Sequence, residues 1–228
     1  MTVINTAVAP KPDNFTVDPR IQFLFAAVRL MGSNSSIRLQ TGDALIAVDV
    51  QNDFLPGGSL AVPEGDAVVP ALNRYLAAFA ARALPVFATR DWHPPDHCSF
   101  KARGGIWPAH CVAETRGGGF ATGLALPQSV VVISKAATPD ADAYSGFGGT
   151  DLAARLRSGG VVRLFIGGLA TDYCVLNTVK DALAEGFAVL LLADAIRAVD
   201  VNAGDGARAQ DEMRRLGARA IRYEDLAP

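Results

Sequence analysis

Four reactive side chains stand at the ends of four short apolar runs of the sequence: Asp49, Asp91, Lys135 and Cys174. The runs are continuous and not alternating, which is typical of strands that are covered on both faces of a parallel sheet. In an open α/β sheet, ligands bind outside the carboxyl ends of the strands. We therefore expect these four side chains to converge on one site.

Cys174 follows an apolar strand and begins a helical pattern that Thr171 or Asp172 could cap. The free N–H groups and the positive dipole of a helix start would lower the pKa of a thiol and could hold an oxyanion. A lysine ammonium from Lys135 would favour the thiolate, and the carboxylate of Asp49 could accept its proton. A free cysteine is more often a small buried hydrophobic residue, so the neighbours carry the interpretation of Cys174 as a nucleophile.

All three histidines fall between residues 93 and 110, close to Asp91: His93, His97 and His110. Two imidazoles and a carboxylate suit zinc or iron and leave coordination positions for water or substrate. The clustering predicts a metal site held by Asp91, His93 and His110. His97 is a candidate fourth ligand, with less to support it.

The elements that must position these residues alternate along the chain. Strands are predicted at 44–48, 85–89, 130–133, 161–166, 189–192 and 220–222, and helices at 65–82, 150–158, 172–186 and 204–217. This alternation predicts a doubly wound α/β fold, a single domain over residues 41–228 with helices on both faces of a mainly parallel sheet of about six strands. A long loop rich in glycine, proline and histidine occupies residues 91–128.

The composition excludes several classes of protein. Of 228 residues, 50% are hydrophobic and 19% are charged, and the net charge is −2 with a pI near 5.9. Such a chain is globular, and it lacks the basic surface that nucleic acid or anionic lipid would require. Three cysteines without a signal peptide favour a reducing, cytoplasmic setting, with Cys98 and Cys111 as packing residues that could compete as soft metal ligands. The longest apolar stretch near the N-terminus, 21–31, is too short to span a membrane.

Residues 1–40 differ from the rest of the chain, because they contain three prolines and no sustained periodicity. We interpret them as a floppy N-terminal extension, or as the product of an upstream start codon with Met31 as the true start. The alternative is an arm that packs on a neighbouring subunit, which would make the protein a homo-oligomer.

Six segments together carry a resemblance to a known family: DVQNDF (49–54), PGGSL (56–60), RDWHP (90–94), WPAHC (107–111), AYSGF (143–147) and ATDYC (170–174). In this order they resemble the nicotinamidases, the metal-bearing branch of the isochorismatase-like cysteine hydrolases. The resemblance covers about residues 43–223. It implies hydrolysis of nicotinamide to nicotinate and ammonia through a cysteine thioester, as in NAD salvage.

The resemblance also implies roles for individual residues. Asp49, Lys135 and Cys174 would form a catalytic triad, and Asp91, His93 and His110 would bind one divalent metal, zinc before iron or manganese. The backbone N–H groups of Ala170 and Cys174 would form an oxyanion hole next to a cis peptide between Leu169 and Ala170. The pyridine nitrogen would lie at or near the metal, in a pocket lined by Phe54, Trp107 and Tyr144.

Three other readings stay open at this point. The chain could be another amide hydrolase of the same superfamily, such as an N-carbamoyl amidase, although those enzymes generally lack the Asp-x-His and second His. It could be a hydrolase in which a metal-bound water attacks and Cys174 is structural. It could also be a metal or redox sensor without enzymatic activity.

Overall fold

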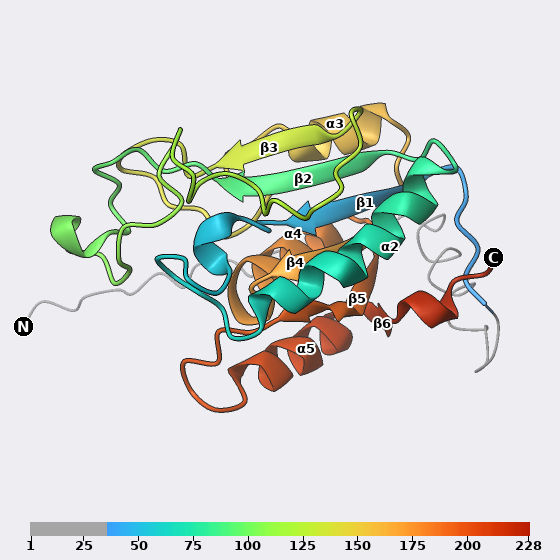
Figure 1. Cartoon of the computed structure of the whole chain (residues 1–228). Coiled ribbons are helices and arrows are strands. Elements are labelled where there is room, and N and C mark those ends of the chain that lie inside the picture. Colours follow the sequence, from blue (N-terminus) through green and yellow to red (C-terminus); the bar gives the residue numbers. More distant parts are fainter. Residues whose placement is uncertain (1–35) are drawn as a thin grey trace, which may run out of the picture. The chain divides into compact units, whose positions relative to one another are not determined.

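The computed structural model describes residues 36–228, in which six strands form one sheet (Figure 1). The strands are Asp43–Val48 (β1), Val86–Asp91 (β2), Val131–Lys135 (β3), Arg163–Leu169 (β4), Ala188–Arg197 (β5) and Arg219–Ile221 (β6). Their order is β3-β2-β1-β4-β5-β6, and every neighbouring pair is parallel. The predicted α/β fold is confirmed, with a sheet that is entirely parallel.

Helices cover both faces of this sheet. They are Val68–Ala80 (α2), Leu152–Ser158 (α3), Leu176–Ala184 (α4) and Asp205–Leu216 (α5). Because successive side chains of a strand point to opposite faces, Leu45 of β1 joins the apolar core under α2, whereas Ile46 joins the core formed with α3, α4 and α5. Figure 1 shows α2 lying across one face of the strands.

The first strand of the chain, β1, lies at the centre of the sheet. From β1 the chain first builds outward through β2 to β3, and then returns to the other side of β1 to build β4, β5 and β6. Such a reversal of strand order opens a crevice at the carboxyl ends of the central strands. Asp49 directly follows β1 and Cys174 lies shortly after β4, so both flank this crevice.

The close approach of β1 and β4 depends on Gly168. A Cβ atom at this position would lie 2.0 Å from the backbone oxygen of Val48, and the residue has φ +128°. No side chain fits there without moving the two central strands apart. Gly186 also has a positive φ, +87°, but a Cβ atom there would have no neighbour within 4 Å.

The two glycines therefore give a matched pair of substitutions. We expect Gly168→Ala to lower the free energy of unfolding by about 1–3 kcal/mol more than Gly186→Ala, because both variants carry backbone strain but only the first forces atoms to overlap. Urea unfolding of both variants measures this difference. Equal losses of stability would contradict the close approach of the central strands.

Ile37, near the start of the described residues, pairs with the end of the chain. The N–H of Ile37 donates to the carbonyl of Asp225 at 2.7 Å, and the N–H of Ala227 donates to the carbonyl of Ile37 at 2.8 Å. Of the expected extension 1–40, residues 1–35 lie outside the described residues. Within 36–228, no helix has the length and apolar character needed to cross a bilayer.

Candidate active site

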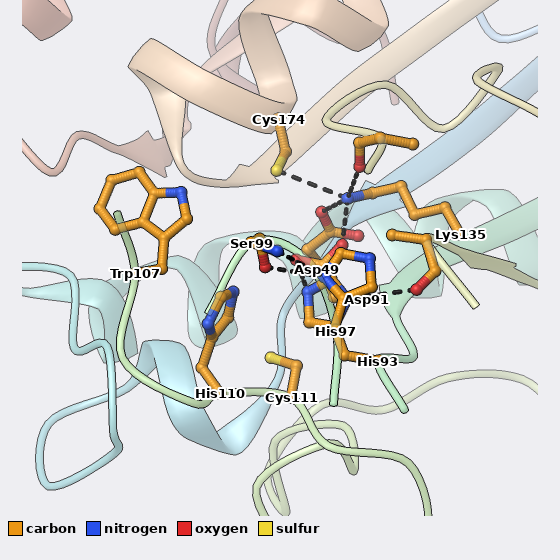
Figure 2. A network of polar contacts seen from close by, with 12 residues as sticks. Asp49, Asp91, His93, His97, Ser99, Trp107, His110, Cys111, Lys135 and Cys174 are labelled. Atoms are coloured by element: carbon orange, nitrogen blue, oxygen red, sulfur yellow. Dashed lines mark hydrogen bonds and ion pairs between the residues drawn. The ribbon is translucent and has the colours of Figure 1, made fainter. Parts of the chain in front are cut away.

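Lys135, the last residue of β3, lies at the centre of the site (Figure 2). Its Nζ is 2.9 Å from Asp49 Oδ2, 2.5 Å from Asp91 Oδ1 and 3.5 Å from Cys174 Sγ. It also donates to the carbonyl oxygen of Ala143 at 3.1 Å. The lysine side chain has no exposed surface, so its position is set by these partners. All four side chains at the strand ends therefore come together, as the sequence predicts.

Asp49 is oriented by a hydrogen bond that the sequence did not reveal. The hydroxyl of Thr89 donates to Asp49 Oδ1 at 2.6 Å. The second oxygen, Oδ2, is buried and has no hydrogen-bond partner among residues 36–228, although it forms the ion pair with Lys135. The thiol of Cys174 lies within 4.8 Å of an oxygen of this carboxylate, which keeps a lone pair for the thiol proton.

The electrostatics of the thiol differ from the sequence-based expectation. Burial raises the pKa of Cys174 well above its ordinary value; Lys135 opposes this rise, while the carboxylates of Asp49 and Asp91 add to it. Lys135 itself is buried, but the same two carboxylates outweigh burial and raise its pKa well above the ordinary value. Burial of the sulfur, the largest of these effects, outweighs the Lys135 ammonium, so the predicted lowering of the thiol pKa was wrong.

Asp49 is suited to remove the thiol proton at the moment of attack. Burial raises the pKa of Asp49, and Lys135 counteracts this only in part. A carboxylate with a raised pKa is a stronger base than an exposed aspartate. The geometry therefore supports proton transfer from Cys174 to Asp49 during the reaction, in place of a resting thiolate.

Cys174 lies in a π-helical turn, Thr171–Val175, that precedes α4. The predicted cap by Thr171 or Asp172 is absent, because no side chain in the described part of the chain caps this turn. The carboxylate of Asp172 instead accepts the N–H groups of Val199 and Asp200, each at 2.9 Å, and so binds a neighbouring loop. The peptide between Leu169 and Ala170 is cis, as the family resemblance implied.

The predicted metal ligands form a second cluster beside the first. One ligand atom from each of Asp91, His93 and His110 lies within 4.8 Å of the others, and all three residues are buried. The Nδ1 atoms of the two histidines lie 3.2 Å from the carbonyl of Ala136 and 2.8 Å from that of Pro108. Each Nδ1 therefore carries the proton, and each Nε2 keeps the lone pair that a metal needs.

This donor set fits a divalent metal ion. Burial lowers the pKa of His93 to about 4, so its imidazole is neutral near neutral pH. Asp91 has one oxygen on Lys135 and the other 3.7 Å from His93 Nε2, so the same carboxylate belongs to both clusters. Burial tends to raise the pKa of Asp91, but the effect of the Lys135 ammonium dominates and the pKa is lowered, which keeps the carboxyl ionised.

His97 occupies a different position from the three clustered ligands. Its ring stacks on His93 with centroids 4.2 Å apart. The N–H of Ser99 donates to its Nδ1 at 3.3 Å, and its Nε2 lies 3.1 Å from the carbonyl of Ala141. With both nitrogens engaged, this arrangement supports His97 as a packing partner of His93 more than as a fourth ligand.

A pocket leads to both clusters. Cys174, Asp91, His93 and His110 reach its wall, and the three residues expected to line it, Phe54, Trp107 and Tyr144, all do so. The indole N–H of Trp107 donates to the hydroxyl of Tyr144 at 3.0 Å, which fixes the two rings relative to each other. Ala170, whose N–H is an oxyanion donor by the family resemblance, also lines the pocket. The pocket therefore offers aromatic side chains next to the Cys174 thiol and the Asp91–His93–His110 cluster.

Sequence reasoning missed several residues that line this pocket, among them Tyr173, Leu60 and Val199. The ring of Tyr173 packs edge-on against Trp107, with centroids 5.2 Å apart, and Leu60 and Val199 complete the apolar wall. Tyr173 precedes the nucleophile in the ATDYC segment, which was the available signal. Val199 comes from the loop after β5, and nothing in its sequence context marks it.

Comparison with known proteins identifies the family. The isochorismatase domain model matches residues 43–225, and the chain belongs to this family. The nicotinamidase of Escherichia coli (strain K12) is 38% identical over 203 residues, covering 80% of this chain and 95% of that protein. A pyrazinamidase of Pyrococcus horikoshii, solved in complex with zinc, is 49% identical with a TM-score of 0.77, over 80% of this chain and 99% of that chain. The PnC1 protein from L. infantum, solved in complex with nicotinate, is 38% identical with a TM-score of 0.78, over 84% and 98%.

Proposed function

We propose that this protein is an amidohydrolase that converts nicotinamide to nicotinate and ammonia, in the service of NAD salvage. One observation carries the proposal: the thiol of Cys174, which contacts the Lys135–Asp49 ion pair, lines the same pocket as the Asp91–His93–His110 cluster. The nicotinamidase relatives, and the related structure with nicotinate, support this choice of substrate.

The chain's own residues can perform each step. Asp49 accepts the proton of the Cys174 thiol, and the sulfur attacks the amide carbon to form a tetrahedral adduct. The N–H groups of Ala170 and Cys174 stabilise the oxyanion, while Lys135 compensates the charge of Asp49 and of the sulfur. Asp49 returns the proton to the departing nitrogen, ammonia leaves, and a thioester remains on Cys174. Water then hydrolyses the thioester with Asp49 as general base, releasing nicotinate and the thiol.

Asp91, His93 and His110 would hold the divalent metal, and zinc is the ion we propose, because two imidazoles and a carboxylate suit it. When bound, the metal supplies a Lewis acid that would bind the pyridine nitrogen and orient the ring. The chain contributes the apolar slot of Phe54 and Trp107, which excludes water from the ring. In this assignment the nucleophile comes from the protein and not from the metal.

Loss of one ligand tests the metal site. We expect His110→Ala to weaken zinc binding by more than about 100-fold, since changes in outer-shell partners alone cost 10–100-fold. His97→Ala serves as the control, because both ring nitrogens of His97 already have protein partners. The loss of zinc affinity in His97→Ala should be at least about ten times smaller than the loss in His110→Ala, and chelator competition measures both. Equal losses in the two variants would make His97 a ligand in its own right.

The decisive test of the reaction is ammonia release from nicotinamide, with metal content measured on the same preparation. Benzamide is the matched substrate, because it keeps the carboxamide and the ring shape but lacks the pyridine nitrogen. We expect fast release from nicotinamide and at least about 100-fold lower kcat/KM for benzamide, which is the loss of a metal-directed contact of about 3 kcal/mol. A zinc-loaded protein that releases no ammonia from nicotinamide would refute the proposed function and leave the other amide substrates of the superfamily.

A further inference from the structure

Gln51 lies within the segment that follows β1, and its side chain is entirely buried. All of its side-chain hydrogen bonds in the structure go to backbone atoms. Its Nε2 donates to the carbonyls of Asp91 and Gly118, both at 2.8 Å, and its Oε1 accepts the N–H of Asp91, also at 2.8 Å. One carboxamide thus binds both the N–H and the C=O of the same aspartate.

The fold explains why Asp91 needs this partner. The ladder between β1 and β2 ends at the pair of Val48 and Thr89, and the N–H of Asp49 makes the last contact with the Thr89 carbonyl, at 3.2 Å. Asp49 has φ 49°, which turns the chain away from the sheet. Strand β2 continues to Asp91, whose polar backbone groups on the β1 side would be left without a strand to pair with. The carboxamide of Gln51 takes the place of the missing peptide group.

Asp91 is the residue at which such support has the largest consequence. Its Oδ1 lies 2.5 Å from Lys135 Nζ, and its Oδ2 faces His93 in the metal cluster. With both backbone groups fixed, the direction of its side chain is fixed as well. A small displacement would lengthen the contact with Lys135 and spread the metal ligands at the same time.

We propose that Gln51 is a positioning residue that sets the geometry of Asp91 for both the metal cluster and the Lys135 ion pair. The proposal rests on the proposed function for its catalytic part, and on the metal cluster alone for its binding part. This positioning role differs from anchoring the glycine-rich loop 116–120, which Gln51 shares with its neighbour Asn52.

Asn52 supplies the matched control. Its Nδ2 lies 2.8, 3.1 and 3.2 Å from the carbonyls of Arg116, Gly119 and Phe120, and it makes no hydrogen bond to Asp91 in the described part of the chain. Gln51 and Asn52 therefore anchor the same loop, but only Gln51 also holds the aspartate. Replacing each amide with an apolar side chain of similar size, in Gln51→Met and Asn52→Leu, separates the two roles.

The experiment measures the zinc Kd of each purified variant by chelator competition, and kcat and KM for nicotinamide at saturating zinc. We expect Gln51→Met to weaken zinc binding 10–100-fold and to lower kcat at least about tenfold, because the ligand and the ion pair both lose their alignment. Asn52→Leu should change each quantity by less than about threefold, although urea unfolding should show that both variants are less stable.

Further outcomes decide the proposal. If Gln51→Met does not fold, Gln51→Asn, which keeps the amide but is one methylene shorter, should show the same weaker zinc binding. Zinc affinity and kcat within about threefold of wild type in a folded Gln51 variant would overturn the proposal, as would equal losses in Asn52→Leu. Failure of both Gln51 variants to fold would assign the residue to fold stability and overturn it too. A wild-type protein without nicotinamide turnover would refute the proposed function, while the ratio of zinc affinities would remain readable.

Discussion

Replacement of Cys174 by alanine is expected to reduce kcat for nicotinamide by at least about 10⁴-fold, because loss of a nucleophile removes the covalent route entirely. The fold and the zinc affinity should be retained, since the sulfur is in contact with Lys135 but is not one of the three clustered metal ligands. Ammonia release, zinc content and urea unfolding measured on one preparation check all three expectations.

Cys98→Ala is the matched control for this experiment. Cys98 is partly exposed, and its sulfur lies 3.9 Å from the ring of His97, away from Lys135. Its replacement should change kcat by less than about threefold. A Cys174→Ala enzyme that keeps more than about a hundredth of wild-type turnover would point to attack by a metal-bound water, with Cys174 as a packing residue.

Replacement of Lys135 by methionine should give the second large effect, on stability as well as on activity. The change leaves Asp49 and Asp91 buried without their cation, and an uncompensated buried charge costs about 3–5 kcal/mol. Turnover should fall at least about 10³-fold, because nothing then balances the charge that forms on the sulfur. Urea unfolding at neutral pH and ammonia release measure the two losses.

The loss of stability in Lys135→Met should depend on pH. Without the ammonium, the carboxyl pKa values in the folded variant rise above those in the unfolded chain. The folded form then binds more protons, so its stability increases as pH falls and the deficit shrinks. Lys180→Met is the control, because the Lys180–Glu212 ion pair is exposed and such pairs contribute at most about 1 kcal/mol. Equal effects of the two substitutions at neutral pH would contradict the description of Lys135 as a buried counterion.

Much of the fold could be predicted because strand and helix patterns in this chain are strong. Each of the six apolar runs became a strand, with shifts at the ends that follow from tertiary pairing. Strand β5 extends to Arg197, well beyond the predicted run at 189–192, because Ile196 and Arg197 pair with Gly168 and Leu169 of β4 after a register shift. Local hydrophobicity does not encode such a pairing between distant segments.

The site was predictable in its residues but not in its electrostatics. Strand ends pointed to the Lys135 cluster, because parallel strands end at one edge of the sheet, and the histidines near Asp91 pointed to the second cluster. Spacing could not show that Asp91 forms an ion pair with Lys135, nor that burial, with two carboxylates nearby, would raise the thiol pKa. The role of Gln51 was hidden for the same reason, since its partner lies 40 positions further along the chain.

The central claim is that the amide passes through a thioester on Cys174, and acyl transfer to hydroxylamine tests it most directly. Water and an added nucleophile compete for an acyl-enzyme. Nicotinamide should therefore yield the hydroxamate together with nicotinate, and the ratio of hydroxamate to nicotinate should rise with hydroxylamine concentration. Cys174→Ala should yield neither product. If wild-type enzyme forms nicotinate alone at every hydroxylamine concentration, and ammonia release continues unchanged, water attacks the amide directly and the thioester mechanism is wrong.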